Sequence, residues 1–270
     1  MKRNPKATAP EGKRGRQRLD LALVERGLTD SRATAQKLIL AGEVRVDGER
    51  ALRASQSVGV GQSLEVLARP PYVSRGGDKL AAALAAFPVD VHGRICADVG
   101  SSTGGFTDCL LQHGATKVYA IDVGHGILHW KLRQDPRVIG LERTNARHLA
   151  ALPEPIDIAT IDVAFISLRL IFPVVRAWLR DGGEVLALVK PQFEAGRGSV
   201  GSGGVVRDPS VHRKVLQDVM AFASAEGLGP QGVIRSPLRG PSGNVEFFLW
   251  ARPGPPTGDL GAEIERAMAG

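Results

Sequence analysis

Residues 95–106 read Ile-Cys-Ala-Asp-Val-Gly-Ser-Ser-Thr-Gly-Gly-Phe. An apolar run ends in the acid Asp98, turns at Gly100, and leads into a segment whose apolar residues, among them Phe106 and Cys109, have helical spacing. A strand, a glycine-rich turn and a helix in this order form the corner of a doubly wound sheet that faces a nucleoside or a phosphate. The stretch therefore predicts an α/β fold with a ligand at this corner.

The spacing within the turn distinguishes between nucleotide ligands. It is D-x-G-x-x-x-G-G and not the G-x-G-x-x-G of dinucleotide binders. An acid before the first glycine is typical of S-adenosylmethionine (SAM) sites, where the turn backbone approaches the methionine part of the ligand. A plain glycine-rich turn without a ligand is the alternative. The SAM hypothesis gives these candidate contacts: Asp98, Gly100, Ser102, Thr103, Gly104, Gly105 and Phe106.

Two later positions extend the predicted cofactor site. Asp122 ends the next apolar run, and an acid about 20 residues after the turn can hydrogen-bond ribose hydroxyls. NAD sites share this feature, so Asp122 does not choose between the two cofactors, and a surface aspartate at a strand end is the simpler alternative. Asn145 follows the third predicted strand, where an adenine is usually held.

The rest of the chain after residue 77 alternates between short apolar runs and segments of helical periodicity. This alternation predicts a Rossmann-like α/β domain at 78–252, with about seven mostly parallel strands and helices on both faces. Several prolines then interrupt residues 253–270 before a final helix. The expected strands are 94–99, 117–122, 137–141, 156–162, 183–189, 230–235 and 245–251, and the expected helices are 78–86, 105–113, 127–134, 168–179, 209–226 and 259–268.

The net charge of +7 is unevenly distributed along the 270 residues. Residues 1–77 contain 15 Lys and Arg against 8 Asp and Glu, whereas the remainder contains 20 of each kind. A basic excess at one end of a chain indicates a polyanionic partner, and nucleic acid is favoured over an acidic membrane surface. A basic tail without a partner is the alternative. It accounts for residues 1–16, which we expect to be disordered, but not for the patterned basic residues after them.

Composition narrows the class of protein. Hydrophobic residues make up 43% of the chain, yet no apolar run is long enough to cross a membrane, and no secretory signal follows the basic N-terminus. Cys96 and Cys109 flank the glycine turn as small core residues, in keeping with a reducing cytoplasm. His125 and His129 lack a third ligand nearby in sequence, so we expect no metal.

Residues 17–68 form the first predicted domain, which a linker at 69–77 joins to the sheet. The pattern R-L-D, then S-R-x-x-A-Q-x-L-I-x-x-G-x-V-x-V-D-G, predicts two short helices and a small sheet. It resembles the small α+β RNA-binding fold named after ribosomal protein S-four, also called the αL motif. A solvated basic helix face is the alternative. The resemblance implies RNA contacts on one surface from Arg14, Arg16, Arg18, Arg32, Lys37 and Arg45.

Four charged residues stand at the edges of the predicted sheet. Lys190 closes an apolar strand, where a lysine is unfavourable to bury unless it is paired or used. Asp162 ends the fourth strand, Glu246 begins the last one, and Lys79 lies in the helix before the sheet. Each could be a surface charge by itself. Because ligands and catalytic groups gather at the carboxyl ends of strands, their joint placement favours a shared function.

The fourth strand also narrows the chemistry. It ends without the Asn/Asp-Pro-Pro-aromatic run of methyltransferases that act on amino groups of bases, and neither cysteine is placed to attack a cytosine carbon. A hydroxyl group is the acceptor that remains.

With these residues the chain resembles the FtsJ-like ribose methyltransferases and their Lys-Asp-Lys-Glu tetrad. More narrowly, it resembles the TlyA/hemolysin A family, which joins an S-four-like domain to that fold. The resemblance spans about residues 18–251. The chain departs from the family pattern at Ser202, where relatives often carry Lys, and at Ala164, where they often carry Ser. Its motifs are S-R-G-G-D-K-L at 74–80, D-V-G-S-S-T-G-G-F-T-D at 98–108, I-D-V-A-F-I-S-L at 161–168, V-K-P-Q-F-E-A-G at 189–196, G-G-V-V-R-D at 203–208 and G-N-V-E-F at 243–247.

The resemblance implies SAM-dependent methylation of a ribose 2′-hydroxyl in ribosomal RNA, with cytidine as the nucleotide and the ribosomal RNA or subunit as partner. Lys190 would remove the hydroxyl proton or align its lone pair, Lys79 would repel the Lys190 charge, and Asp162 and Glu246 would orient the two amines. The loop at 196–204 could close over RNA. Two alternatives stay open: an RNA-binding or ribosome-assembly factor with an idle SAM fold, and a membrane-active hemolysin.

Overall fold

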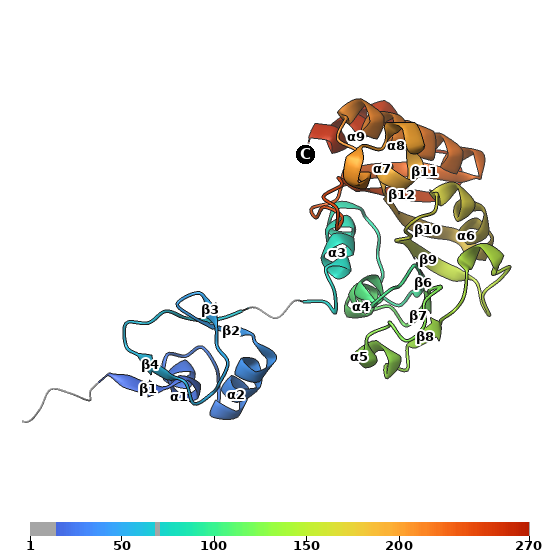
Figure 1. Cartoon of the computed structure of the whole chain (residues 1–270). Helices are drawn as coiled ribbons and strands as arrows, with labels where there is room; N and C mark the ends of the chain where they lie inside the picture. Colours follow the sequence, from blue (N-terminus) through green and yellow to red (C-terminus); the bar gives the residue numbers. More distant parts are fainter. Residues whose placement is uncertain (1–14, 68–70, 270) are drawn as a thin grey trace, which may run out of the picture. The chain divides into compact units, whose positions relative to one another are not determined.

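The computed structural model describes residues 15–67 and 71–269, and the chain forms two compact units, residues 1–69 and 70–270 (Figure 1). Most of the tail expected to be disordered lies outside the described residues, as do Arg14 and positions 68–70 of the linker. Arg16 does not belong to such a tail, because it begins the first strand. The first strand therefore includes Arg16, a residue that the sequence pattern assigned to the tail.

Two short helices and two small antiparallel sheets make up the first unit. Strand β1 (Arg16–Arg18) pairs with β4 (Ser57–Gly59), while β2 (Val44–Val46) lies between β3 (Glu49–Arg50) and β5 (Leu64–Val66). The helices are α1 (Leu19–Glu25) and α2 (Arg32–Ala41). The Ser31 side chain caps α2 by accepting a hydrogen bond from the Thr34 backbone, and Gly42 ends it with a φ of 76°. The core of the unit includes Leu19, Leu23, Leu38, Ile39, Val44 and Val58.

Asp20 of α1 places a fully buried carboxylate beneath the basic residues of this unit. It accepts two hydrogen bonds from Arg18, at 3.0 and 2.9 Å, one from Arg32 at 2.9 Å and one from Gln36 at 2.8 Å. The Arg18 guanidinium, with Gln36 and Arg32, holds the pKa of Asp20 well below its usual range. Arg18 and Arg32 are therefore anchored to Asp20 and about half exposed, and the RNA contacts expected of them stay a prediction.

The other expected RNA-binding residues are spread over the unit. Arg16 donates to the Ser57 carbonyl at 3.1 Å, and Lys37 is exposed on α2. Arg45 of β2 lies opposite Arg50 in β3 and opposite Glu65 in β5 in the strand register. Residues 15–67 contain eight Lys and Arg and seven Asp and Glu, so most of the basic excess lies in the segments on either side of them.

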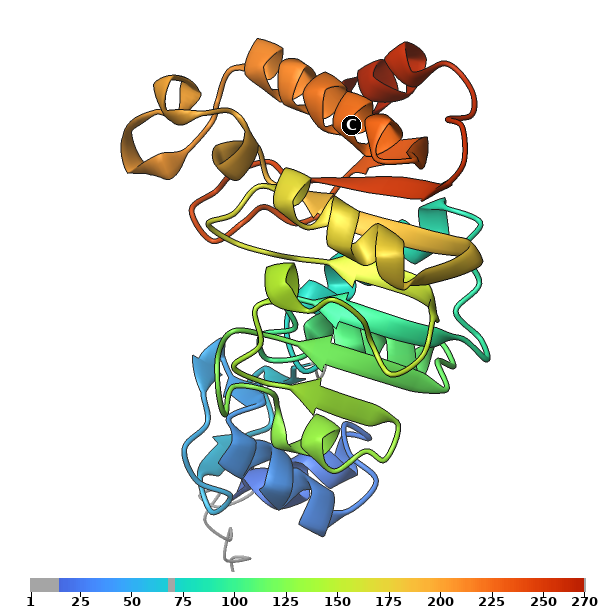
Figure 2. The same ribbon diagram turned by 90° about the vertical axis from the view of Figure 1, so that its right-hand side faces the viewer.

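A seven-stranded mixed sheet organises the second unit, in the order β11-β12-β10-β9-β6-β7-β8 (Figure 2). Only β12 and its two neighbours pair antiparallel; the remaining pairs are parallel, which confirms the predicted fold class. The strands are β6 (Ile95–Val99), β7 (Lys117–Ile121), β8 (Val138–Leu141), β9 (Ile156–Ile161), β10 (Leu179–Val189), β11 (Leu228–Arg235) and β12 (Phe247–Pro253). The helices are α3 (Gly76–Ala86), α4 (Gly105–Gln112), α5 (Trp130–Arg133), α6 (Phe172–Trp178), α7 (Pro191–Glu194), α8 (Pro209–Ala225) and α9 (Leu260–Ala269).

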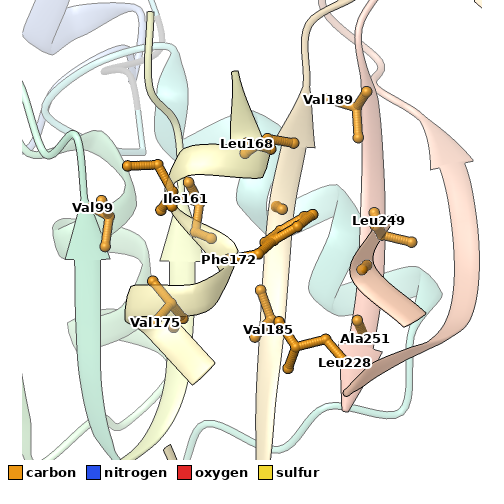
Figure 3. Close-up of a cluster of buried hydrophobic side chains, with 14 of the residues drawn as sticks. Val99, Ile161, Leu168, Phe172, Val175, Val185, Val189, Leu228, Leu249 and Ala251 are labelled. Atoms are coloured by element: carbon orange, nitrogen blue, oxygen red, sulfur yellow. The ribbon is translucent and has the colours of Figure 1, made fainter. Parts of the chain in front are cut away.

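Helices cover both faces of the sheet because alternate strand residues point to opposite sides. On one face, Leu80 of α3 and Leu110 of α4 pack on strand residues such as Val118, and both cysteines are buried there as free thiols. On the other face, Phe172 of α6 is surrounded by Val185, Leu249 and further strand residues (Figure 3). Ile264 of α9 joins this second core, so the C-terminal helix belongs to the same unit as the sheet.

Three expected elements differ in their bounds. The helix predicted at 168–179 is divided into a 3-10 turn (Leu168–Leu170) and α6, whose first turn contains Pro173, a residue that cannot donate the backbone hydrogen bond a continuous helix requires. Helix α5 is shorter than its prediction at 127–134. Strand β10 begins before residue 183, with a register shift against β9 between Leu179 and Glu184.

We expect Asp20→Ala to destabilise the first unit by about 2 kcal/mol, because several hydrogen bonds to a charged acceptor are removed. Hydrogen–deuterium exchange of the α1 and α2 amides in the full chain measures this. Folding lowers the pKa of Asp20, so its carboxylate stabilises the unit at any pH above the ordinary pKa of an aspartate. This stabilisation is lost as the pH falls from that value towards the lowered pKa. The exposed Asp30→Ala is the control with the same change of charge; equal exchange in both variants would contradict the role of Asp20.

Candidate active site at the carboxyl edge of the sheet

The glycine-rich turn after β6 brings three backbone segments close together. Gly100 has a φ of 85°, and a Cβ built on it would lie 2.5 Å from the Asp162 carbonyl oxygen. Only glycine fits there, because the end of β9 passes directly over the turn. Ser102 also has a positive φ, 49°, and its backbone N–H donates to the Asp122 carboxylate at 2.8 Å. The turn is therefore held between the ends of β7 and β9.

A cleft of about 450 Å³ opens beside this turn, and it contains most of the residues predicted to hold a cofactor. Gly104, Asp122 and Asn145 are not among its lining residues. Asn145 is exposed, and its side chain accepts from the Arg147 backbone at 3.1 Å, so it caps the 3-10 turn Ala146–His148. The lining residues are Ser74, Arg75, Gly76, Lys79, Asp98, Gly100, Ser101, Ser102, Thr103, Gly105, Phe106, Asp162, Arg239 and Pro241.

Asp98 has no exposed surface, although it belongs to this cleft. Its carboxyl group accepts from the Thr107 hydroxyl at 2.7 Å and from the Thr160 hydroxyl at 3.4 Å, and so connects α4 and β9 through the end of β6. Burial raises the pKa of Asp98 to about 7, because the charged form loses its hydration. Asp98 thus holds the turn in place through its contacts with α4 and β9.

Asp122 also acts on the turn backbone. One carboxylate oxygen accepts from Ser102 and the other from the Gly124 N–H at 2.7 Å. Each oxygen keeps a further lone pair, which leaves capacity for an additional donor.

Two ion pairs bring the four predicted catalytic side chains together. The Lys79 ammonium lies 2.5 Å from a Glu246 carboxylate oxygen, and the Lys190 ammonium lies 2.6 Å from Asp162 Oδ1. The two pairs are adjacent, because Val189 pairs with Phe247 across β10 and β12, so that Lys190 and Glu246 are the next residues along these strands. The fold thus brings Lys79 and Glu246 into contact although they are 167 residues apart in the sequence.

Each amine of this cluster has one carboxylate beside it. Glu246 balances the charge of Lys79, so the repulsion that Lys79 exerts on Lys190 is reduced. Asp162 Oδ1 is buried, and the Lys190 ammonium at 2.6 Å balances its charge.

Two residues that the sequence pattern did not indicate support Glu246, whose side chain is only 1% exposed. A Cβ on Gly240 would lie 2.4 Å from the Glu246 carboxylate, so a larger residue here would displace that carboxylate. Asn244 is buried and connects two loops: its amide donates to the Gly204 carbonyl at 2.9 Å, and its oxygen accepts from the Val206 N–H at 2.9 Å. The run Gly240-Pro-Ser-Gly-Asn244 was the available signal. Its contacts also show that the loop expected to be free at 196–204 is attached at its end.

An aromatic pair, Phe165 and Phe193, also had no clear signal in the sequence. Phe165 is 91% exposed and has a positive φ of 63°, a conformation that bulky residues rarely adopt. Its ring centroid lies 5.1 Å from that of Phe193, and the Lys190 ammonium lies 6.0 Å from the Phe193 ring. Phe165 follows Asp162 by three residues, so the pair borders the charged cluster.

Comparison with known proteins assigns both units. Residues 72–253 match the FtsJ-like methyltransferase family, and residues 17–64 match the S4 domain. The chain belongs to the FtsJ-like methyltransferase family. The predicted resemblance is thereby confirmed for both parts of the chain.

Relatives within this family cover most of the chain. It is 51% identical over 87% of its length to a Bacillus subtilis protein provisionally described as rRNA methyltransferase YqxC, of which 85% is covered. It is 48% identical over 88% of its length to the 16S/23S rRNA (cytidine-2′-O)-methyltransferase TlyA of Mycobacterium tuberculosis, of which 90% is covered. A solved Streptococcus thermophilus structure, provisionally described as a hemolysin, shares 43% identity and a TM-score of 0.71, covering 94% of this chain and 95% of the other.

This FtsJ-like chain has neither a membrane-spanning helix nor a metal-binding cluster among its described residues. Across residues 15–67 and 71–269, no helix has the length and apolar character to cross a membrane, and no three His, Cys, Asp or Glu side chains gather as metal ligands would. His125 instead pairs with Glu142 at 2.7 Å, and His129 caps α5.

We expect Asp98→Asn to change how stability depends on pH. Because folding raises the pKa of Asp98 to about 7, the wild-type side chain stabilises the fold fully below the ordinary aspartate value and loses that contribution as the pH rises towards 7. The amide does not titrate, so the variant should lack this slope, and the difference should reach the order of a few kcal/mol. Urea unfolding at a series of pH values from 4 to 8 measures it.

Asp135→Asn is the control for this measurement. It removes a partly exposed carboxyl group beside Arg137, whose guanidinium lowers the pKa of Asp135, and it should leave the slope above pH 5 unchanged. Parallel stability curves for the wild type and Asp98→Asn would contradict the assignment of the slope to Asp98.

Proposed function

We propose that this chain transfers the methyl group of SAM to the 2′-hydroxyl of a cytidine ribose in ribosomal RNA, within the cytoplasm. The observation that carries the proposal is the convergence of Lys79, Asp162, Lys190 and Glu246 into two adjacent ion pairs beside the cleft of the glycine-rich turn. Support for ribosomal RNA comes from the TlyA relative and from the match of the first unit to the S4 domain.

The cleft fits SAM in size and chemistry. Its volume of about 450 Å³ lies within the range of small-molecule sites. Phe106 offers an apolar wall, and Asp162 places a carboxylate in the lining, which suits a cationic ligand. We propose that Gly100, Ser101, Ser102, Thr103, Gly105 and Phe106 hold the cofactor, with Asp98 fixing the turn behind them. When bound, SAM supplies a methyl group already activated on a sulfonium, so the chain has to prepare only the acceptor.

Lys190 prepares the acceptor hydroxyl in this proposal. A ribose hydroxyl is a weak nucleophile until a neighbouring group aligns its lone pair or takes its proton. The Lys190 ammonium is fixed by Asp162, and its neighbour Glu246 is fixed in turn by Lys79, so the amine is held in one place. Positioning of this kind supplies a large part of the rate in reactions between two bound groups.

The exposed Phe165, with the partly buried Phe193 behind it, supplies a surface for the base of the target nucleotide. An unpaired base gains stability when it stacks on an aromatic side chain, and methylating enzymes commonly act on nucleotides removed from a helix. The position of the pair next to Lys190 would place the attached ribose beside the charged cluster.

We expect Lys190→Ala to abolish measurable methyl transfer from labelled SAM to undermethylated ribosomal RNA, because the hydroxyl loses the group that prepares it. SAM affinity from calorimetry and RNA affinity should stay within a few fold. Lys190→Arg should not restore turnover, since a guanidinium is larger, planar and permanently protonated. Full turnover of the arginine variant would show that a positive charge alone suffices. Turnover of the alanine variant would show that the Lys190 amine is not needed for methyl transfer and would contradict the proposed role of the cluster.

We expect Phe165→Ala to raise the KM for RNA or lower kcat by about tenfold, because stacking on an aromatic ring is worth about 1–3 kcal/mol per base. Phe165→Trp should retain activity, as it keeps an aromatic face. Both variants should unfold like the wild type, because the ring is exposed. Equal kinetics for the alanine variant and the wild type would show that the base is held elsewhere.

A further inference from the structure

A second cleft, of about 490 Å³, lies next to the active site in the same unit. It is bounded by the segment that follows the loop at 196–204, by the end of β11 and by the loop that leads to Glu246. Three of its lining residues are arginines, Arg207, Arg235 and Arg239, and none is acidic among the described residues that line it. The sequence motif at 203–208 contains the first of them, and the proposed chemistry makes no use of it.

Among the described residues of the unit, six arginines are paired with acids, whereas these three are not. Arg213 is paired with Glu265, Arg266 with Glu263, and Arg137 with Asp135. Within 15–67 and 71–269, by contrast, no ion pair involves any of the three arginines of the second cleft; Arg239 donates only to the Gly243 carbonyl, at 3.2 Å. Guanidinium groups that share a cleft repel one another, and an anion between them removes that repulsion. The cleft therefore has the charge of an anion site.

The second cleft is rigidly connected to the catalytic cluster. Asn244 joins the segment at Gly204 and Val206 to the loop before β12, and this loop ends at Glu246. Arg239 lines both clefts, and the next residue, Gly240, lies against the Glu246 carboxylate. Figure 2 shows the two loops side by side beyond the ends of the strands. An anion bound in the second cleft would lie a short distance from the acceptor position.

We propose that Arg207, Arg235 and Arg239 bind the phosphodiester backbone of the RNA strand that carries the target nucleotide. This inference rests on the proposed function and adds a phosphate-binding site within the methyltransferase unit itself. A guanidinium binds phosphate oxygens through two parallel hydrogen bonds, so three of them can fix the strand in one register. Contacts to phosphate position an RNA without reading its sequence.

The distribution of charge favours an RNA strand over a free anion. The described part of the first unit has a net charge of +1, and the second unit carries equal numbers of basic and acidic residues beyond residue 77. The arginine cleft is therefore a local concentration of positive charge in a nearly neutral unit, at the place where a polyanion must pass to reach Lys190. A small anion would not need a site that shares Arg239 with the active-site cleft.

The test compares two double variants of the full chain. Arg207→Gln with Arg235→Gln removes two charges from the cleft and leaves Arg239, which touches the active-site cleft, in place. Arg213→Gln with Lys214→Gln removes two charges from α8, where both residues are paired with acids outside the cleft. Binding to undermethylated ribosomal RNA is measured over a series of salt concentrations. SAM affinity and thermal unfolding are measured alongside.

We expect the cleft variant to bind RNA at least about tenfold more weakly at moderate salt, and the slope of log K against log salt to decrease by about 1 for each phosphate that is no longer bound. SAM affinity and unfolding should match the wild type, and the α8 variant should behave like the wild type throughout. Equal weakening in the two variants would show that only net charge matters, and an unchanged RNA affinity in the cleft variant would overturn the site.

Calorimetry with inorganic phosphate and pyrophosphate forms a separate arm. Tight binding of either anion by the wild type, abolished in the cleft variant while RNA affinity is kept, would assign the cleft to a small anion and overturn the proposal. The proposed function is tested independently by methyl transfer in the wild type. If the wild type methylates ribosomal RNA and the cleft variant binds and methylates it equally well, this inference fails while the function stands.

Discussion

The structure of the active site depends on one buried carboxylate. Glu246 is almost fully buried at the start of β12, where an unpaired charge would be strongly unfavourable, and Lys79 of α3 supplies the compensating cation. This contact joins the beginning of the methyltransferase unit to its last strand. It also fixes the position of Lys190, which lies beside Glu246 across the β10–β12 pair and is held from the other side by Asp162. Removal of either charge would leave the other buried without a partner.

Backbone approach is the second constraint. The end of β9 passes so close to the turn after β6 that only Gly100 fits, and the absence of a side chain at Gly240 leaves room for the Glu246 carboxylate. These two positions allow Asp162 and Glu246 to enter the site from different strands. Asp98, buried between Thr107 and Thr160, keeps the turn from moving away. Packing therefore holds the candidate site in place.

Charge serves different purposes in the two units. In the first unit, Arg18 and Arg32 are arranged by the buried Asp20, so their exposed edges are held in a defined position. In the second unit, six arginines are paired with acids, whereas within 71–269 those of the second cleft are not. An RNA bound by the first unit would meet two guanidinium groups that Asp20 already holds in place. Ordered groups lose less conformational entropy on binding than mobile side chains do.

Local pattern in the sequence determined the strand, turn and helix around residues 95–106, the cap and stop of α2, and the seven strands of the sheet, because these features depend on neighbouring residues and on side-chain periodicity. It also indicated Asp162, Lys190 and Glu246 as candidates, since charges at the ends of apolar strands are recognisable without a structure, and the resemblance to the FtsJ-like family added Lys79 from the helix before the sheet. Only the tertiary structure decided which charge pairs with which, that Asp20 anchors two arginines, and that Arg207, Arg235 and Arg239 share a cleft. Such contacts depend on the order of strands in the sheet and on loops that meet across it, and residues 167 apart in sequence carry no local signal that they will touch.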